Sequence, residues 1–150
     1  MTQALAELAA ELGPLEVAAL YLTEPVSDEA QPDYWNTAAV GTTRLRAEEL
    51  LAIAQRVEER LGRRRERHGA PRTLDIDLLL LGAELRNHLA PLLPHPRLRA
   101  RRFVLAPLAE LAPDWPLPPD GATPAELLAR LPERPWVRQV APRGWPHEVP

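Results

Sequence analysis

The run of ten residues from 73 to 82, TLDIDLLLLG, constrains the fold of this chain most, because it turns abruptly from charged to apolar sequence. Its length is typical of a buried strand, and Gly82 closes it. Asp75 and Asp77 stand at its beginning, which is unusual for such a strand. In extended backbone, residues i and i+2 face the same side about 6.6 Å apart, so we expect the two carboxylates to converge on one face while Ile76 points to the other.

The remaining pattern predicts helices and strands in alternation. Apolar residues at helical spacing predict a short helix over residues 2–12, ended by Gly13, and a longer one over residues 47–61, ended by Gly62. Residues 15–22 and 34–43 are rich in β-formers and predict two antiparallel strands with a long connecting loop. Residues 98–113 have broken helical character.

The C-terminal part adds one more helix. Thr123 and Glu126 form a capping box with Pro124 in the first helical position, which predicts a helix through about Leu131. The order of elements predicts the α+β class, with a small antiparallel sheet and helices packed on it. We expect a single domain over residues 1–131 and a Pro-rich C-terminal tail over residues 132–150, in which residues 136–140 could form one short strand.

Composition excludes several classes of function. A chain of 150 residues that is 45% hydrophobic fits one globular domain, and a net charge of -3 argues against binding to nucleic acid through bulk charge. The absence of cysteine excludes disulfides, thiol nucleophiles and Cys-ligated zinc. No apolar run approaches the roughly 18 to 20 residues that span a bilayer, and the N-terminus is acidic where a signal peptide is basic. We therefore expect a soluble, cytoplasmic protein that binds no membrane.

The aspartate pair and the arginines before it suggest phosphate chemistry. Two close carboxylates repel unless a cation neutralises them, and Mg²⁺ prefers a few carboxylates together with substrate phosphates. Taken alone, the pair is equally well explained as two solvated or Arg-paired aspartates. Five arginines lie just upstream, namely Arg63, Arg64, Arg65, Arg67 and Arg72. Guanidinium groups suit phosphate oxygens, so carboxylates and arginines together suggest metal-assisted polyphosphate transfer, with a solvated basic loop as the alternative.

Other side chains are candidates for ligand contacts. Two of the group Tyr34, Asn36 and Phe103 could sandwich a flat ring while the amide hydrogen-bonds its edge, although each alone is typical of core or turn. His95, between two prolines, could donate to a phosphate, or it could be structural. All 18 basic residues are arginine, and the chain has no glycine-rich phosphate loop, so a P-loop enzyme and a protein kinase are excluded.

The string from His68 to Leu79, HGAPRTLDIDLL, resembles the signature of the 6-hydroxymethyl-7,8-dihydropterin pyrophosphokinase family. The resemblance runs in family order from about residue 2 to residue 120. It also covers the segments YLTEPV (21–26) and QPDYWN (31–36), Gln55 with Glu58, and the segment RRF (101–103).

The resemblance implies a ferredoxin-like α+β fold and transfer of pyrophosphate from ATP to the hydroxymethyl group of the pterin, releasing AMP, in folate biosynthesis. It implies that Asp75 and Asp77 hold two Mg²⁺ ions and that Arg63 and Arg72 are catalytic. The implied ATP-binding residues are Gln55, Glu58, Arg65, Arg67, His95 and Arg101. The implied pterin-binding residues are Thr23, Val26, Tyr34, Asn36 and Phe103. We expect ATP and the pterin as ligands, a monomer, and no nucleic-acid partner.

One family feature has no counterpart in this sequence. Members usually begin with a strand and a Gly-Ser-Asn loop ahead of the first helix, whereas this chain begins in that helix. A start codon placed too late, a degenerate copy, and compensation by another strand such as residues 136–140 each explain the difference. The alternative function is therefore a catalytically silent relative that binds nucleotide or pterin without turnover.

Overall fold

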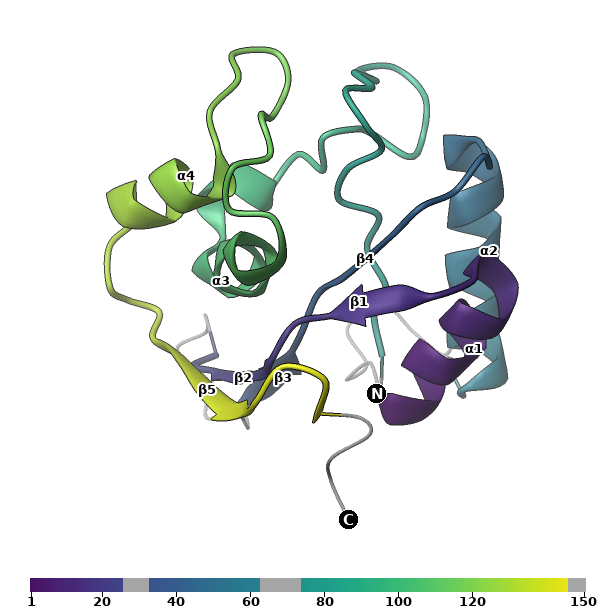
Figure 1. Cartoon of the computed structure of the whole chain (residues 1–150), viewed down its shortest axis with the longest axis horizontal. Coiled ribbons are helices and arrows are strands. Elements are labelled where there is room, and N and C mark those ends of the chain that lie inside the picture. The colour runs from purple at the N-terminus through teal and green to yellow at the C-terminus, as the bar shows by residue number, and fades with distance from the viewer. Residues whose placement is uncertain (26–32, 63–73, 146–150) are drawn as a thin grey trace. The chain divides into compact units, whose positions relative to one another are not determined.

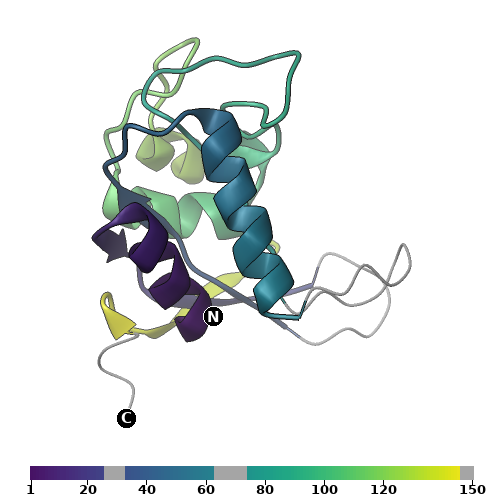
Figure 2. The same ribbon diagram turned by 90° about the vertical axis from the view of Figure 1, so that its right-hand side faces the viewer.

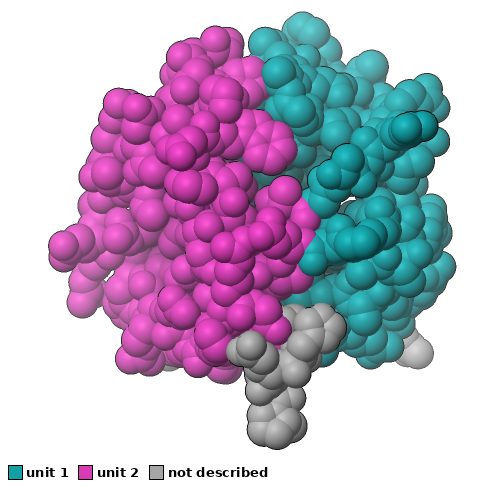
Figure 3. All heavy atoms as spheres, viewed as in Figure 1, with its two compact units in different colours: residues 1–15, 41–95 teal, residues 16–40, 96–150 magenta. Residues whose placement is uncertain are grey.

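The computed structural model describes residues 1–25, 33–62 and 74–145. The chain divides into two compact units, and each unit is assembled from two separate stretches of sequence (Figure 3). Unit 1 contains Met1–Leu15 and Gly41–His95, and unit 2 contains Glu16–Val40 and Pro96–Pro150.

Two packed helices form the body of unit 1. The helices α1 (Thr2–Leu12) and α2 (Ala47–Arg60) lie side by side (Figure 2) and begin and end close to the predicted positions. Gly13 ends α1 with a positive φ of 88°, which favours glycine. On the solvent side, Glu11 of α1 accepts hydrogen bonds from Arg56 and Arg60 of α2. The amphipathic pattern of residues 47–61 predicts the apolar part of the buried face correctly, with Leu50, Ile53 and Val57 buried, but it does not predict the burial of Glu58.

A three-stranded antiparallel sheet is the centre of unit 2. The strand β2 (Leu20–Thr23) lies between β3 (Tyr34–Asn36) and β5 (Val137–Ala141), as Figure 1 shows. The short 3-10 helix η1 (Leu98–Ala100) leads into α3 (Arg102–Leu111), which packs against α4 (Pro124–Arg130) and contacts all three strands. Fully buried leucines fill this unit, namely Leu98, Leu105, Leu108 and Leu117.

Both predicted N-terminal strands are broken in two. Residues 15–22 form β1 (Leu15–Val17) and β2, and residues 34–43 form β3 and β4 (Ala39–Gly41), with β1 paired to β4. The break falls at Ala18 and Ala19, which are completely buried. The Thr37 hydroxyl lies 3.2 and 3.1 Å from their carbonyl oxygens and donates there, while the Ala18 N–H still donates to the Ala38 carbonyl oxygen at 2.9 Å. A side chain therefore takes the place of part of the ladder. The predicted antiparallel pairing is confirmed for β2 and β3.

The predicted strand over residues 73–82 is wrong for the described part of that segment, residues 74–82, which contains no strand. Exposure nevertheless alternates from residue 74 to residue 78, as it does in extended backbone. The His95 N–H donates to the Leu79 carbonyl oxygen at 2.8 Å, and His95 belongs to no strand. An apolar extended segment becomes a strand only where a neighbouring strand supplies a ladder, and its own sequence cannot provide that partner.

Within residues 1–25, 33–62 and 74–145, four α-helices and small antiparallel sheets confirm the predicted α+β class. The capping box of α4 is also confirmed, because Thr123 Oγ1 accepts from the Glu126 N–H and the Glu126 carboxylate accepts from the Thr123 N–H. Residues 137–141 of the predicted tail form β5. The division at residue 131 stays a prediction. No helix in the described part of the chain is long and apolar enough to cross a membrane.

Candidate functional site

The aspartate pair of unit 1 is anchored from behind by a buried glutamate. Asp75 and Asp77 are exposed, and Ile76 between them is half-buried. The Ile76 N–H donates to Glu58 Oε1 of α2 at 2.6 Å. Glu58 itself is only 4% exposed, so this carboxylate lies against the backbone between the two aspartates. The extended segment therefore presents two acidic side chains to solvent while α2 holds its backbone in place.

His95 lies beside the same segment. Its Nε2 is 3.9 Å from Asp77 Oδ1, and its own N–H donates to the Leu79 carbonyl oxygen at 2.8 Å. The backbone of His95 thus fixes its imidazole near the second aspartate. The structure brings together four residues that the sequence singled out, namely Glu58, Asp75, Asp77 and His95.

Replacing Glu58 by alanine is expected to lower the free energy of unfolding by about 1–3 kcal/mol, because the half-buried Ile76 N–H loses its acceptor. Urea unfolding followed by circular dichroism measures this change. Glu59→Ala is the matched control, since Glu59 is the exposed neighbour on α2, and it should change stability by less than about 0.5 kcal/mol. Equal stability of the two variants would contradict the anchoring role of Glu58.

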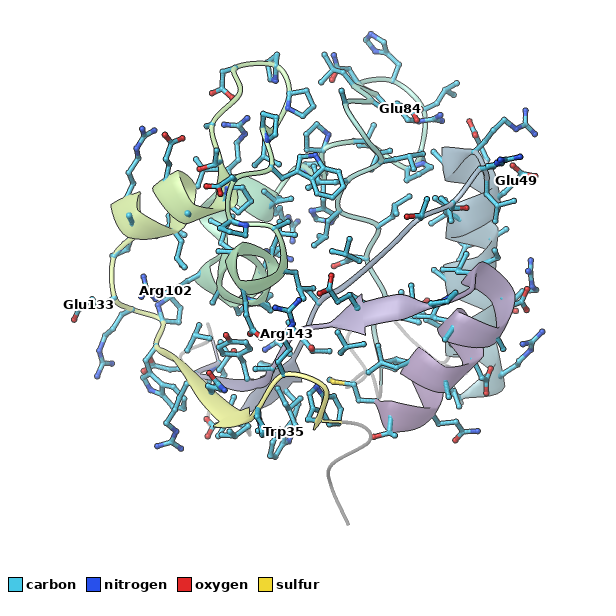
Figure 4. The ribbon with its side chains drawn as sticks, in the orientation of Figure 1. Trp35, Glu49, Glu84, Arg102, Glu133 and Arg143 are labelled. Atoms are coloured by element: carbon cyan, nitrogen blue, oxygen red, sulfur yellow. The ribbon has the colours of Figure 1, made fainter. Side chains whose placement is uncertain are left out.

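A second group of predicted residues meets on the sheet of unit 2. Thr23 at the end of β2 is 2% exposed and is the register partner of Tyr34 on β3. Asn36 Nδ2 donates to Thr23 Oγ1 at 2.8 Å and lies 3.3 Å from the Tyr34 carbonyl oxygen. Trp35 faces away from α3 on the other side of the sheet (Figure 4). Thr23, Tyr34 and Asn36 therefore form one cluster, with the Tyr34 side chain 49% exposed.

Phe103 and Arg101 lie next to one another where α3 begins. Arg101 is the N-cap residue of α3, and its guanidinium carbon lies 5.4 Å from the centroid of the Phe103 ring. A guanidinium at this distance from an aromatic ring is attracted to its face. The pair places one cation beside one flat ring, in the same unit as the Thr23 cluster.

Sequence reasoning missed a polar contact that ties α3 to β2. Both carboxylate oxygens of Glu110 lie 3.1 Å from the Ala19 nitrogen, and Oε2 accepts from the Tyr21 hydroxyl at 2.8 Å. After Arg102, its first residue, α3 is apolar except for Glu110. A single carboxylate in an apolar helix was the sequence signal that could have indicated this contact. Its partners are about 90 residues away in sequence, so no local pattern reveals them.

The Glu110 contact predicts an unusual titration of Tyr21. Burial, the hydrogen bond to Glu110 and its negative charge raise the pKa of Tyr21 to about 12. Because the folded chain holds this proton more tightly than the unfolded chain, the associated stability is complete below about pH 10 and is lost as pH rises toward 12. The sequence contains two tyrosines, so Tyr34→Phe leaves Tyr21 as the sole phenol.

Near-ultraviolet absorbance of Tyr34→Phe should show tyrosinate forming near pH 12 in the folded protein and near pH 10 in denaturing urea. Adding Glu110→Gln should move the folded midpoint downward. A folded-state midpoint near pH 10 in the single variant would contradict the contact.

Comparison with known proteins decides the family. The model of the 7,8-dihydro-6-hydroxymethylpterin-pyrophosphokinase family matches residues 1–113 of the chain. The chain belongs to this family. The match includes the aspartate pair, His95, the Thr23 cluster and the Arg101–Phe103 pair.

Curated pyrophosphokinases support the assignment. The chain is 43% identical over 116 residues to 2-amino-4-hydroxy-6-hydroxymethyldihydropteridine pyrophosphokinase of Pseudomonas aeruginosa, covering 77% of this chain and 71% of the relative. It is 44% identical over 96 residues to the enzyme of the same name from Bacillus subtilis, and the alignment covers 64% of this chain and 58% of the relative. The chain is 36% identical over 129 residues to the Synechocystis protein of that name, and the alignment covers 85% of this chain and 66% of the relative. The chain thus spans between 58% and 71% of these three pyrophosphokinases.

The acidic segment fits a metal that arrives together with a polyphosphate. Asp75 and Asp77 supply exposed carboxylates, with the His95 imidazole close to Asp77. Within the described residues, no three His, Cys, Asp or Glu side chains gather closely enough to hold a metal by themselves. Mg²⁺ is usually bound through one or two carboxylates, with phosphate oxygens and waters completing its octahedron. Asp75 and Asp77 are the side chains of this segment that could hold such an ion.

The other predicted residues of the pyrophosphokinase site fall into two groups. Gln55 is exposed on α2, one turn before Glu58. Five predicted residues lie outside the described part of the chain, namely Val26, Arg63, Arg65, Arg67 and Arg72. Their roles stay predictions.

Proposed function

We propose that this chain transfers the diphosphoryl group of ATP to the hydroxymethyl oxygen of 6-hydroxymethyl-7,8-dihydropterin, giving the pterin diphosphate and AMP. The observation that carries the proposal is the family match over residues 1–113, which spans both groups of candidate residues. The names of the curated relatives support the same substrate class. The activity is proposed because the chain covers only part of those enzymes.

In the proposed reaction the hydroxymethyl oxygen attacks the β-phosphorus of ATP and loses its proton to solvent. The bond between that phosphorus and the oxygen bridging to the α-phosphate breaks, and AMP leaves with the bridging oxygen. Negative charge on the phosphate oxygens must be neutralised as the group transfers. We assign that task to the Arg63 and Arg72 guanidiniums, which suit phosphate oxygens geometrically.

Asp75 and Asp77 would hold Mg²⁺ against the ATP phosphates. Bound there, the metal would supply positive charge and a fixed geometry for the polyphosphate. The chain's own contribution is to keep both carboxylates on the exposed side of the segment, which the Ile76–Glu58 hydrogen bond supports. That two ions bind stays a prediction.

The nucleotide contacts are proposed for the cationic and polar side chains that the family resemblance implies. His95 is close enough to Asp77 to share the ionic environment of the phosphates, and Arg101 offers a guanidinium. The full proposed set for ATP is Gln55, Glu58, Arg65, Arg67, His95 and Arg101.

The pterin contacts are proposed for the sheet cluster and Phe103. A pterin is a flat ring with hydrogen-bonding edges, which aromatic side chains can stack on and an amide can recognise. Tyr34 and Phe103 supply the rings and Asn36 supplies the amide, held by Thr23. Val26 completes the proposed set.

The test is AMP release from ATP and Mg²⁺ by the purified chain, with and without the pterin alcohol. We expect AMP only when all three are present. ATP binding by a folded chain with no AMP released in the presence of pterin would contradict the proposed activity and indicate the silent relative instead. A cytoplasmic location and a monomeric state stay predictions from the sequence.

A further inference from the structure

The C-terminal strand of unit 2 lies directly against the proposed pterin cluster. β5 pairs antiparallel with β2, and Val137 is the register partner of Thr23. Thr23 therefore has Tyr34 on one side and Val137 on the other. The family model ends at residue 113, so this neighbour comes from outside the matched part of the chain.

Glu24, the residue after Thr23, joins this strand to β2 through three hydrogen bonds. Its N–H donates to the Trp136 carbonyl oxygen at 3.2 Å. Its carboxylate accepts from the Trp136 N–H at 3.1 Å and from Arg134 Nη1 at 2.9 Å. Glu24 thus holds the backbone of Trp136 at both its N–H and its carbonyl, one residue away from Thr23.

The backbone connects Glu24 directly to the ligand cluster. Glu24 shares a peptide bond with Thr23, whose hydroxyl accepts from Asn36 Nδ2 at 2.8 Å. Thr23 is 2% exposed, so its side chain has little room to compensate for a shift of the strand end. A displacement of Glu24 would therefore displace the hydroxyl that orients the Asn36 amide.

We propose that Glu24 is a positioning residue for pterin binding, which fixes Thr23 and Asn36 by fastening the end of β2 to residues 134–137. The proposal rests on the proposed function, since it names the ligand that the cluster would receive. It assigns a part in substrate recognition to a C-terminal segment that the family match does not include.

The chain offers a matched control at the other end of β5. Glu16 at β1 accepts a hydrogen bond from Arg143, which follows β5 and is labelled in Figure 4. This pair also joins the N-terminal and C-terminal stretches of unit 2 through one glutamate and one arginine. Neither residue belongs to the proposed ligand cluster.

The experiment measures the dissociation constant of 6-hydroxymethyl-7,8-dihydropterin by calorimetry, with a non-hydrolysable ATP analogue present, for the full chain. Glu24→Ala is expected to weaken pterin binding about tenfold, since a misplacement of contacting groups by 1 Å can cost up to about a hundredfold. Glu24→Gln keeps an acceptor for the Trp136 N–H and should recover part of the loss. Glu16→Ala should bind pterin as the unchanged chain does, and none of these variants should alter binding of the ATP analogue alone.

A second readout follows the cluster without ligand. The Asn36 side-chain amide signal can be assigned by NMR through its own β-carbon, which distinguishes it from the amides of Asn87 and of the four glutamines. This signal should move in Glu24→Ala and stay in place in Glu16→Ala.

Equal pterin binding by Glu24→Ala and the unchanged chain, or an equal loss in Glu16→Ala, would overturn the positioning role alone. An unchanged chain that binds no pterin would overturn the proposed function, and with it the ligand named here. The two failures are therefore distinguishable.

Discussion

Asp77→Asn should reduce pterin-dependent AMP release about a thousandfold. The substitution keeps the size of the side chain and removes one of the two negative charges that would hold Mg²⁺ against ATP. A thousandfold loss corresponds to about 4 kcal/mol of transition-state stabilisation, which is in the range expected for a metal ligand in phosphoryl transfer. Asp75→Asn should have an effect of the same order, because both carboxylates belong to the same exposed side of the segment.

The expected loss has a specific signature. Raising the Mg²⁺ concentration should restore part of the activity of either variant, since a weaker site is filled by mass action. Asp114→Asn changes an exposed aspartate after α3 and serves as the control with full activity. Activity above a tenth of the unchanged value in both Asp75→Asn and Asp77→Asn would remove this segment from the proposed metal site.

Leu105→Ala should lower the free energy of unfolding by about 2–5 kcal/mol, the usual cost of a buried leucine replaced by alanine. Leu105 is completely buried in α3, two residues after Phe103. Its truncation leaves a cavity beneath the helix that carries the Phe103 ring and the Glu110 carboxylate. Urea unfolding followed by tryptophan fluorescence and by circular dichroism measures the loss.

Leu89→Ala is the control for this prediction. Leu89 is 70% exposed, so its substitution removes little buried apolar area and should change stability by less than about 0.5 kcal/mol. A loss below about 1 kcal/mol for Leu105→Ala would show that Leu105 is not closely packed.

Local signals in the sequence predicted the helices well. The apolar stripe of residues 47–61 gave α2, Gly13 marked the end of α1, and the pair Thr123 and Glu126 gave the beginning of α4. Each of these signals depends on residues within one or two turns of the helix itself. The antiparallel pairing of β2 with β3 was also predicted, because both segments are rich in β-formers, whereas Thr23 was placed just beyond the first predicted strand.

Features that depend on distant partners were not predictable. The apolar run after Asp77 has the composition of a strand, yet a strand needs a neighbour that its own residues cannot specify. The break at Ala18 and Ala19 depends on the Thr37 hydroxyl, and the role of Glu110 depends on Tyr21. The predicted nucleotide residue Glu58 is buried against Ile76, a contact that the helical pattern of α2 does not reveal.

The pairing of β2 with β5 has a consequence for how this chain is made. Glu24 and Trp136 are 112 residues apart in sequence, and ribosomes add only about 5–20 residues each second. During synthesis one edge of β2 therefore stays unpaired for several seconds, and an unpaired strand edge can pair with another chain. The proposed pterin cluster takes its final form only when residues 137–141 have left the ribosome. A nonsense mutation after residue 131 would produce a chain that keeps both aspartates and all of α3 but never closes this edge of β2.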